Sequence, residues 1–284
     1  MRLLIYGYGF SGRVFAQRMT ADGWTVLATF RNDRTRDLIL SDGLTALDVS
    51  DGQGLARALV ETDALLVTPP PGALGCPALN VLAPALIESG ARPGWTGYLS
   101  TTGVYGDRRG GWVRETTPLS PKSAEGTRRV AAERDWLALG ETLELIVTVF
   151  RLPGIYGPGR SAFDRLREGR ARRIATPGQV FSRIHVADLA AGLAASIARP
   201  RAGGIYNLCD DEPAPNSEVI AYAAGLLGLE SPPEVALEDA NLTPTALRFY
   251  AENKRVSNAR AKSELGWQPA FASYREGLSA ILKG

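Results

Sequence analysis

Short aliphatic runs alternate with helical patterns along the first 150 residues of this chain. The apolar runs predict strands over residues 2–6, 24–30, 43–47, 63–68, 95–100 and 143–150. Helical spacing of apolar positions predicts helices between them, near residues 11–22, 51–61, 77–90 and 122–140. This alternation is typical of a parallel sheet with helices on both faces. The run 143–150 is almost continuously apolar, which indicates a central strand buried on both sides.

The rhythm changes after Arg151. A turn-rich stretch leads into an arginine-rich segment, 165–173, and a helix is then predicted over 186–198 and a short strand over 204–208. Prolines break the tail, 213–284, into short predicted helices. We therefore expect an α/β fold with a doubly wound parallel sheet and a smaller C-terminal lobe. The predicted division is a sheet domain of residues 1–156 plus about 184–205, and a smaller lobe of about 157–183 and 206–284.

Three glycines lie between the first predicted strand and the first predicted helix. Residues 3–12 form an apolar run that leads into Gly7, Gly9 and Gly12. A dinucleotide pyrophosphate requires this order, because Gly7 permits the tight turn, Gly9 lets phosphates approach bare backbone, and Gly12 lets helix and strand pack closely. The N-terminus of the following helix attracts the phosphates through its amides and dipole. The sequence predicts a dinucleotide site here, and the alternative is a glycine-rich turn without a ligand.

Composition narrows the classes of function. The 284 residues are 45% apolar and 22% charged, as in ordinary soluble globular proteins, and a net charge of +2 is too small to indicate a nucleic-acid partner. No apolar run reaches about 18 residues, so we expect no membrane span. Cys76 and Cys209 lack metal or disulfide spacing and suit a reducing cytoplasm. His185 is the only histidine, which argues against a metal site.

The end of the second predicted strand bears on which dinucleotide binds. In sites that prefer NAD, an Asp or Glu there accepts hydrogen bonds from the ribose 2′-hydroxyl. This chain has Phe30 and Arg31 at that point, with Arg34 and Arg36 close behind. A guanidinium binds a 2′-phosphate, which a carboxylate would repel, so NADP(H) is favoured over NAD(H). The alternative is that Arg31 is a surface residue and that Phe30 stacks on the adenine.

The third predicted strand is followed by a carboxylate. Asp48 and Val49 lie at this end of the strand, where Asp48 could accept a hydrogen bond from the adenine amino group. An Asp at the start of a helix, Asp48 or Asp51, is just as often an N-cap. Both interpretations stay open at this point.

Several short segments together resemble a known family. They are Gly7 to Gly12, Asp48-Val49, Ser100-Thr-Thr-Gly-Val-Tyr-Gly106, Arg151-Leu-Pro-Gly-Ile-Tyr-Gly157, Ile184-His-Val-Ala-Asp188, Ile205-Tyr-Asn-Leu208 and Glu264-Leu-Gly-Trp267-Gln-Pro269. Their order and spacing, over essentially the whole chain, resemble the extended, partly atypical short-chain dehydrogenase/reductases, the NAD-dependent epimerase/dehydratase-like proteins. The resemblance implies a Rossmann domain that binds NAD(P) and a C-terminal lobe that closes over the substrate.

The catalytic signature of that family is altered in this chain. Its enzymes carry a Ser or Thr at the end of the fifth strand and a Tyr-x-x-x-Lys on the next helix, where Tyr is the acid/base and Lys holds the nicotinamide ribose. Thr101 matches the Ser/Thr position. Alignment through Ala131-Ala-Glu133 puts Glu125 at the Tyr position and Arg129 at the Lys position. The family's usual proton relay is therefore absent.

Glu125 and Tyr105 are the candidates for proton transfer beside Thr101. A carboxyl group acts as an acid near neutral pH only if desolvation raises its pKa to roughly 6–7, and a neighbouring Arg129 would oppose that change. The alternative for Glu125 is a solvent-facing helical residue, and for Tyr105 a packed aromatic that anchors its loop. His185 is expected to be a structural hydrogen-bonding residue between the lobes.

The resemblance and the residues together predict a cytoplasmic NADP(H)-dependent oxidoreductase or epimerase that acts on a small polar substrate such as a sugar nucleotide. Thr101 would bind the substrate oxygen. The expected cofactor contacts are Gly7, Gly9, Phe10, Ser11, Gly12, Arg31, Asp48, Val49, Thr68, Pro69, Pro153 and Ile155. The arginine-rich segment is a solvated helix end or, alternatively, a patch that meets a substrate phosphate or carboxylate. The rival class is a non-catalytic NADP(H)-binding sensor, and a homodimer is left open.

Overall fold

A seven-stranded parallel sheet forms the centre of the molecule. The computed structural model describes residues 1–243, 247 and 249–283. The sheet has the strand order β11-β7-β5-β4-β1-β2-β3, and each neighbouring pair runs parallel. The strands are β1 (Arg2–Tyr6), β2 (Thr25–Phe30), β3 (Thr45–Asp48), β4 (Ala64–Val67), β5 (Trp95–Thr101), β7 (Val147–Leu152) and β11 (Gly204–Asn207). The predicted doubly wound α/β fold is confirmed.

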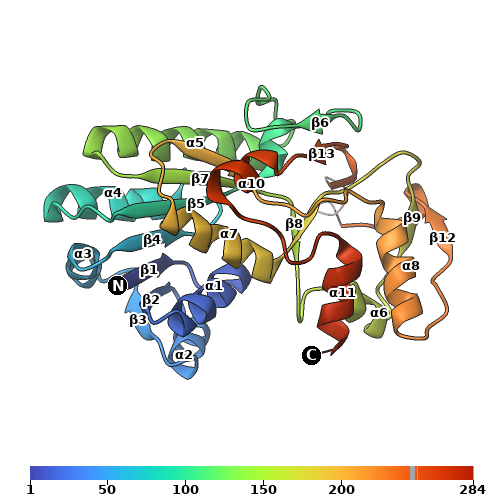
Figure 1. The fold of residues 1–284 in the computed structure, drawn as a ribbon, viewed down its shortest axis with the longest axis horizontal. Helices are drawn as coiled ribbons and strands as arrows, with labels where there is room; N and C mark the ends of the chain where they lie inside the picture. The colour runs from blue at the N-terminus through green and yellow to red at the C-terminus, as the bar shows by residue number, and fades with distance from the viewer. Residues whose placement is uncertain (244–246, 248, 284) are drawn as a thin grey trace.

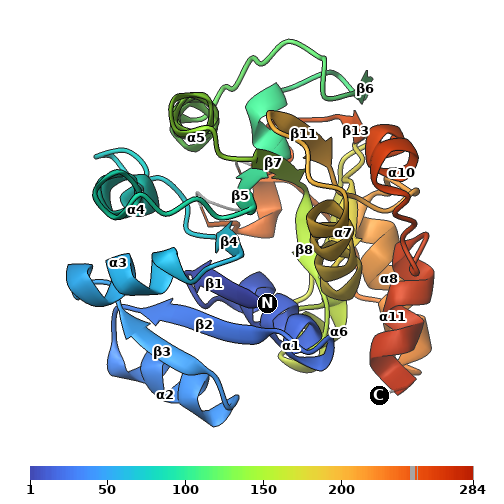
Figure 2. The same cartoon turned by 60° about the vertical axis from the view of Figure 1, so that its left-hand side comes forward.

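Helices cover both faces of this sheet, as Figures 1 and 2 show. One face carries α1 (Phe10–Ala21), α2 (Asp33–Ser41), α7 (Val186–Ala198) and α10 (Ala259–Leu265), and the other carries α3 (Gly52–Val60), α4 (Pro77–Ser89) and α5 (Ala124–Leu143). Each face buries its own apolar cluster against these helices. Strand β4 is fully buried, and β1 is buried from Leu3 onward, because a central parallel strand is covered from both sides.

Helix α2 was not among the predicted helices. It begins after Asn32, whose side chain accepts a hydrogen bond from the Thr35 amide at 3.0 Å and so caps the first turn. Of its residues only Ile39 is fully buried. A nine-residue helix with one buried side chain carries a weak apolar pattern, and the cap at Asn32 was the available sequence signal.

The predicted strand 143–150 begins too early. Helix α5 continues to Leu143, and Glu144 ends it in the left-handed conformation with φ of 55°. Strand β7 then runs from Val147 to Leu152, because its last residues pair with Ser100 and Thr101 of β5. The run is apolar throughout, so the period of its side chains could not separate the helix end from the strand start.

A smaller group of elements lies beyond one end of the sheet (Figure 1). It contains α6 (Ala162–Arg167), β9 (Arg173–Ala175), α8 (Asn216–Leu226), β12 (Glu234–Ala236) and α11 (Tyr274–Lys283). These helices share a separate apolar cluster that includes Phe163, Ile220 and Tyr274. The cluster gives this region a hydrophobic core of its own, beside the walls of the two cavities described below.

Short elements join this region to the sheet. They are η1 (Thr102–Tyr105), β6 (Trp112–Val113), β8 (Gly154–Tyr156), β10 (Arg183–His185), η2 (Glu238–Ala240) and β13 (Arg255–Val256). Strand β8 pairs with β10, and β6 pairs with β13. The tail also returns to the main core, where Leu265 and Trp267 pack and the Trp267 indole donates to the Asp188 carbonyl at 3.1 Å. Among the described residues no helix combines the length and apolar character needed to cross a bilayer.

Candidate functional site

The glycine turn forms a cradle between β1 and α1. Gly7 has φ of 96°, and a Cβ there would lie 2.6 Å from the Thr68 hydroxyl oxygen and 2.8 Å from Pro69. A Cβ on Gly12 would lie 2.9 Å from the Gly7 carbonyl oxygen. The Thr68 hydroxyl also donates to that carbonyl at 2.7 Å. The turn therefore requires glycine at both positions, and Thr68 and Pro69 form its wall.

The start of α1 offers room and the right charge for a phosphate. Gly9 is the N-cap, has no side chain to cap the helix, and a Cβ there would have no neighbour within 4 Å. Phe10 and Ser11 follow in the first turn, which holds no acidic residue. Open backbone amides with the positive end of a helix dipole bind phosphates. A dinucleotide pyrophosphate fits this cradle.

Arg31 and Asp48 lie at the adjacent ends of β2 and β3. Both side chains are exposed, and Phe30 is half-buried against the core. The Asp48 carboxylate accepts from the amide and the hydroxyl of Ser50, at 2.8 and 2.7 Å, and these bonds lower its pKa. The α3 N-cap is Asp51, which accepts from the Gly54 amide at 2.8 Å. Asp48 is therefore not the helix N-cap, and its carboxylate lies at the end of β3.

Val49, directly after β3, forms a hydrogen bond to the end of β2. Its amide donates to the Phe30 carbonyl at 3.1 Å. Behind Arg31, Arg36 forms ion pairs with Asp33 at 2.8 Å and with Asp37 at 3.1 Å. Arg36 is therefore paired within its own helix, whereas Arg31 is exposed at the end of β2.

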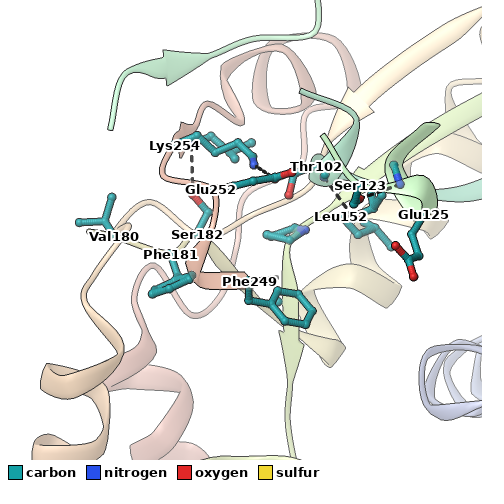
Figure 3. Close-up of a pocket in the computed structure, with 16 residues that line it drawn as sticks. Thr102, Ser123, Glu125, Leu152, Val180, Phe181, Ser182, Phe249, Glu252 and Lys254 are labelled. Atoms are coloured by element: carbon teal, nitrogen blue, oxygen red, sulfur yellow. Dashed lines mark hydrogen bonds and ion pairs between the residues drawn. The ribbon is translucent and has the colours of Figure 1, made fainter. Parts of the chain in front are cut away.

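A cavity of about 260 Å³ lies at the carboxyl ends of β5 and β7 (Figure 3). We call it the first cavity. It is lined by Thr101, Thr102, Gly103, Ser123, Glu125, Gly126, Leu152, Pro153, Gly154, Val180, Phe181, Ser182, Phe249, Glu252, Lys254 and Val256. In parallel α/β sheets, ligands bind at this edge. The structure thus brings Thr101, Glu125 and Pro153 of the predicted site to one cavity, with Ile155 next to it in β8.

Thr101 is the last residue of β5 and is half-buried. Its hydroxyl oxygen accepts from the Gly103 amide at 3.1 Å, which caps the η1 turn. That bond leaves the hydroxyl proton available to a ligand oxygen. The predicted role of Thr101, binding a substrate oxygen, requires a hydroxyl that faces the cavity, and Thr101 lines it.

Glu125 lines the first cavity but keeps much of its contact with water. Its side chain is 53% exposed and lies 3.8 Å from the Arg128 guanidinium. A carboxyl acid that works near neutral pH needs desolvation, and half of this side chain is exposed. Arg129 turns the other way, because its guanidinium donates to the Leu99 carbonyl and to the Tyr98 hydroxyl at 3.3 Å.

Tyr105 is not among the residues that line the first cavity. Its side chain is fully buried in η1. The hydroxyl donates to the Asn207 side chain at 2.8 Å and accepts from Arg151 at 3.1 Å. Burial raises its pKa, although Arg151 acts in the opposite direction. The structure supports the alternative, a packed aromatic that anchors its loop.

A buried ion pair supports the floor of the site. Arg151, in β7, and Glu133, in α5, are 2.8 Å apart, and the Ser100 hydroxyl donates to Glu133 at 2.5 Å. These bonds connect α5, β7 and the end of β5 directly next to Thr101. The role of this pair is not visible in the sequence, because its members are far apart along the chain.

His185 is a structural residue. It caps α7, where its Nδ1 accepts from the Ala187 amide at 3.3 Å, and its ring contacts Phe271 and Tyr156 at centre distances of 4.4 and 5.3 Å. Burial lowers its pKa to about 4, so the ring is neutral near pH 7. The packed ring agrees with a structural role, but its hydrogen bond lies within α7 and Nε2 has no hydrogen-bond partner among the described residues, so the expected hydrogen bond between the lobes is not found. Among the described residues no cluster of His, Cys, Asp and Glu could hold a metal ion.

Sequence reasoning missed the side of the first cavity that comes from the C-terminal region. Glu252 and Lys254 form an ion pair there, and both side chains are largely buried. Phe249 and Ser182 complete this side. No local pattern marks these residues. Glu252 and Lys254 directly precede β13, which is held in place by its pairing with β6.

A second cavity, of about 560 Å³, adjoins the first. The two share Gly154, Phe181, Ser182 and Phe249. Four arginines line the second cavity: Arg160, Arg165, Arg170 and Arg183. Arg170 pairs with Glu168, whereas the Arg160 guanidinium lies 5.4 Å from the centre of the Phe10 ring. The arginine-rich segment thus lines a cavity, and Arg160 connects this cavity to the start of α1.

Comparison with known families agrees with this geometry. The model of the NAD dependent epimerase/dehydratase family matches residues 3–209. The chain belongs to this family. The match spans the glycine cradle and the Thr101 end of β5, and it ends at Cys209, before the segment that carries Lys254.

Two curated proteins that are similar to this chain have names that state different activities. The chain is 32% identical over 163 residues to a 3-diazoavenalumate denitrifying reductase from a Streptomyces species. This alignment covers 54% of the chain and 52% of that protein. The chain is 24% identical over 197 residues to a dTDP-glucose 4,6-dehydratase from Xanthomonas campestris, which covers 64% of the chain and 55% of that protein. The chain thus spans about half the length of the curated relatives that it matches.

Some solved structures of similar proteins match this chain over nearly its full length. A protein of unknown function from Silicibacter pomeroyi is 47% identical, with a TM-score of 0.92 and coverage of 99% of this chain and 98% of that one. A dTDP-glucose 4,6-dehydratase from Streptomyces venezuelae, solved with NAD bound, is 22% identical, with a TM-score of 0.80 and coverage of 100% and 96%. At that identity the second comparison shows a shared fold.

Proposed function

We propose that this family member is an NAD(P)(H)-dependent oxidoreductase or epimerase that acts on a small polar substrate with an anionic group. The observation that carries the proposal is the pairing of an open glycine cradle with the first cavity, where Thr101 ends β5. When bound, a nicotinamide dinucleotide supplies or accepts a hydride. Gly7, Gly9 and Gly12 would hold its pyrophosphate, and Pro153 lines the side of the cavity expected for the nicotinamide.

In this proposal Thr101 binds the substrate oxygen. Its hydroxyl is fixed by the Gly103 amide, and the strand beneath it is held by Ser100 and the ion pair of Glu133 and Arg151. A donor held in this way can orient a carbonyl without paying for rearrangement. Leu152 and Pro153 give the adjacent wall an apolar surface.

We further propose that the cofactor is NADP(H). Arg31 is exposed at the end of β2, and no Asp or Glu takes that position. Arg36 is already paired within α2, so Arg31 and Arg34 are the guanidinium groups that remain to meet a 2′-phosphate. A charge-assisted hydrogen bond to phosphate favours NADP(H).

The second cavity supports a substrate that carries a phosphate or a carboxylate. Its cationic lining includes Arg160 and Arg165, and it opens into the first cavity through shared lining residues. A sugar nucleotide has this layout, with a sugar to be oxidised or epimerised and a diphosphate. The dTDP-glucose 4,6-dehydratases among the relatives support the same class.

The test starts with cofactor binding and then measures turnover. NADPH and NADH are titrated by fluorescence, and dTDP- and UDP-sugars are incubated with each oxidised and reduced cofactor. Absorbance of the reduced nicotinamide and mass spectrometry of the sugar products report the reaction. Cofactor binding with turnover supports the proposal, and a protein that binds neither cofactor contradicts it.

One observation favours a second function, a non-catalytic NADP(H) sensor. Arg129, at the family's Lys position, donates to the backbone of β5 instead of facing the first cavity. A sensor would bind NADPH and undergo a change in hydrogen exchange over β13 and α10, with no product from any substrate class tried. Product formation would exclude it.

A further inference from the structure

The Lys254 side chain lines the first cavity and carries an ammonium group, which is a hydrogen-bond donor. Its side chain is 9% exposed and is paired with Glu252, which is 14% exposed. Among the described residues that line this cavity, Lys254 is the one lysine or arginine. In Figure 3 the pair lies on the opposite side of the cavity from Glu125, with Thr102 between them. Burying a charged pair costs free energy, so its place in a cavity wall calls for a role.

The backbone on both sides of Lys254 is held rigidly. The Asn253 amide donates to Asp107 at 2.8 Å, and the Asn253 side-chain oxygen accepts from the Val180 amide at 3.2 Å. The Val256 amide donates to the Ser182 hydroxyl oxygen at 3.0 Å. A side chain between two fixed residues loses little entropy when it binds a ligand, which is the arrangement that a catalytic group requires.

Among the described residues, the opposite wall of the first cavity is lined by no lysine or arginine. Glu125 is half-exposed, Arg129 faces the β5 backbone, and Tyr105 is buried outside the cavity. We propose that Lys254 is the proton donor and acceptor of the first cavity, and that Glu252 is a positioning residue that orients its ammonium group. This inference rests on the proposed function, because it assigns the proton step of that reaction.

In the reduction of a carbonyl, Lys254 would transfer its proton to the substrate oxygen. With a reduced nicotinamide dinucleotide bound, the substrate carbon would gain a hydride, the dinucleotide would be oxidised, and the electrons of the carbonyl π bond would become a lone pair on oxygen. An N–H bond of the Lys254 ammonium breaks as an O–H bond forms on that oxygen. The neutral amine then regains a proton from water. Oxidation of an alcohol runs through the same atoms in reverse.

The test uses 4-nitrophenol as a probe of the developing oxyanion, so it does not depend on a known substrate. The full-length protein is saturated with NADP⁺, and the absorbance of bound 4-nitrophenol is followed against pH. Next to the Lys254 ammonium the phenol should ionise more readily. Lys254→Met should reduce its ionisation constant about tenfold, the size expected for one charge-assisted hydrogen bond.

Three further variants make the test specific. Lys254→Arg keeps the charge but cannot release a proton, so it should retain the effect on 4-nitrophenol and lose turnover of any substrate found. Glu252→Gln should move the pH midpoint of the absorbance change while NADPH affinity stays constant. Lys262→Met is the matched control, because Lys262 pairs with Asp211 at 2.6 Å outside both cavities, and it should behave as the parent.

The outcomes separate this inference from the proposed function. A parent protein that leaves the ionisation of 4-nitrophenol unchanged, or a folded Lys254→Met variant that matches the parent, overturns the role of Lys254. If Lys254→Met does not fold, Lys254→Arg decides: full turnover by that variant overturns the role, and loss of the 4-nitrophenol effect in it does so too. Failure of NADPH to bind contradicts the proposed function instead.

Discussion

The Arg151 guanidinium and the Glu133 carboxylate form an ion pair at 2.8 Å, with side chains that are 3% and 4% exposed. The pair spans β7 and α5, and the Ser100 hydroxyl joins it from β5. Arg151 also donates to the Tyr105 hydroxyl at 3.1 Å. One buried charged pair thus sets the relative positions of the strand end that carries Thr101 and the turn that follows it.

Removing one member of this pair should destabilise the fold. Glu133→Gln leaves the Arg151 charge buried without its partner, and the expected loss in free energy of unfolding is about 3–5 kcal/mol. Urea denaturation measures it. Arg134→Ala is the control, because Arg134 pairs with Asp135 at side-chain exposures of 77% and 43%, and it should cost less than about 1 kcal/mol. Equal losses in the two variants would contradict this account.

Two glycine substitutions should separate cofactor binding from folding. Gly9→Val adds a side chain where a Cβ has no neighbour within 4 Å, so circular dichroism and thermal stability should stay close to the parent. NADPH affinity should be lost, because the side chain fills the space of the pyrophosphate. Gly12→Val should instead cost about 1–3 kcal/mol of stability, since its Cβ would lie 2.9 Å from the Gly7 carbonyl oxygen. Retained NADPH binding by Gly9→Val would place the cofactor elsewhere.

Arg31→Ala should reduce the preference for NADPH over NADH. One charge-assisted hydrogen bond to the 2′-phosphate corresponds to about ten- to a hundredfold in affinity. Calorimetric titration of both cofactors measures this ratio. Arg18→Ala is a suitable control, because Arg18 lies in the last turn of α1 and its side chain is 45% exposed. Equal affinities for the two cofactors in the parent protein would show that Arg31 does not select between them.

Asp210 should make the protein less stable as the pH rises. It is 2% exposed, and burial raises its pKa from 3.8 to about 8, although the Arg183 charge and nearby backbone amides act in the opposite direction. Between about pH 4 and pH 8 the unfolded carboxyl releases its proton while the folded one keeps it, so the unfolded state is favoured progressively.

Asp210→Asn removes this titration and should flatten the stability profile. The variant should resemble the parent near pH 4 and exceed its free energy of unfolding at pH 8. Denaturant titrations at intervals from pH 4 to pH 8 test this, with Asp37→Asn, an exposed position paired with Arg36, as the control. A parent and an Asp210→Asn variant with parallel profiles would refute the assignment.

The order of elements was predictable because each local pattern carries its own physical signal. Alternating apolar strands and helices indicated the parallel sheet, and the spacing of Gly7, Gly9 and Gly12 indicated the cradle. Asn32 was a weaker signal, since a cap alone does not separate a short helix such as α2 from a turn. The end of α5 at Leu143 was not predicted, because an apolar run is equally compatible with a buried helix and a buried strand.

The direction of side chains depends on contacts between distant residues. Tyr105 follows the strand end in sequence, yet its hydroxyl lies between Arg151 and Asn207, so it anchors the loop instead of facing the first cavity. Arg129 turns toward the Leu99 carbonyl for a similar reason. No spacing along one helix or loop could reveal these partners.

The sequence by itself therefore determined the class of fold, the family resemblance and the cradle at Gly7 to Gly12, because turn, strand and helix N-terminus are adjacent in the chain. Only the tertiary structure decided which side chains share the first cavity. Thr101 and Lys254 are 153 positions apart and meet there because β13 pairs with β6 and Ser182 holds the Val256 amide. Local sequence carries periodicity and backbone preference, whereas a cavity is closed by long-range packing, which leaves no local pattern.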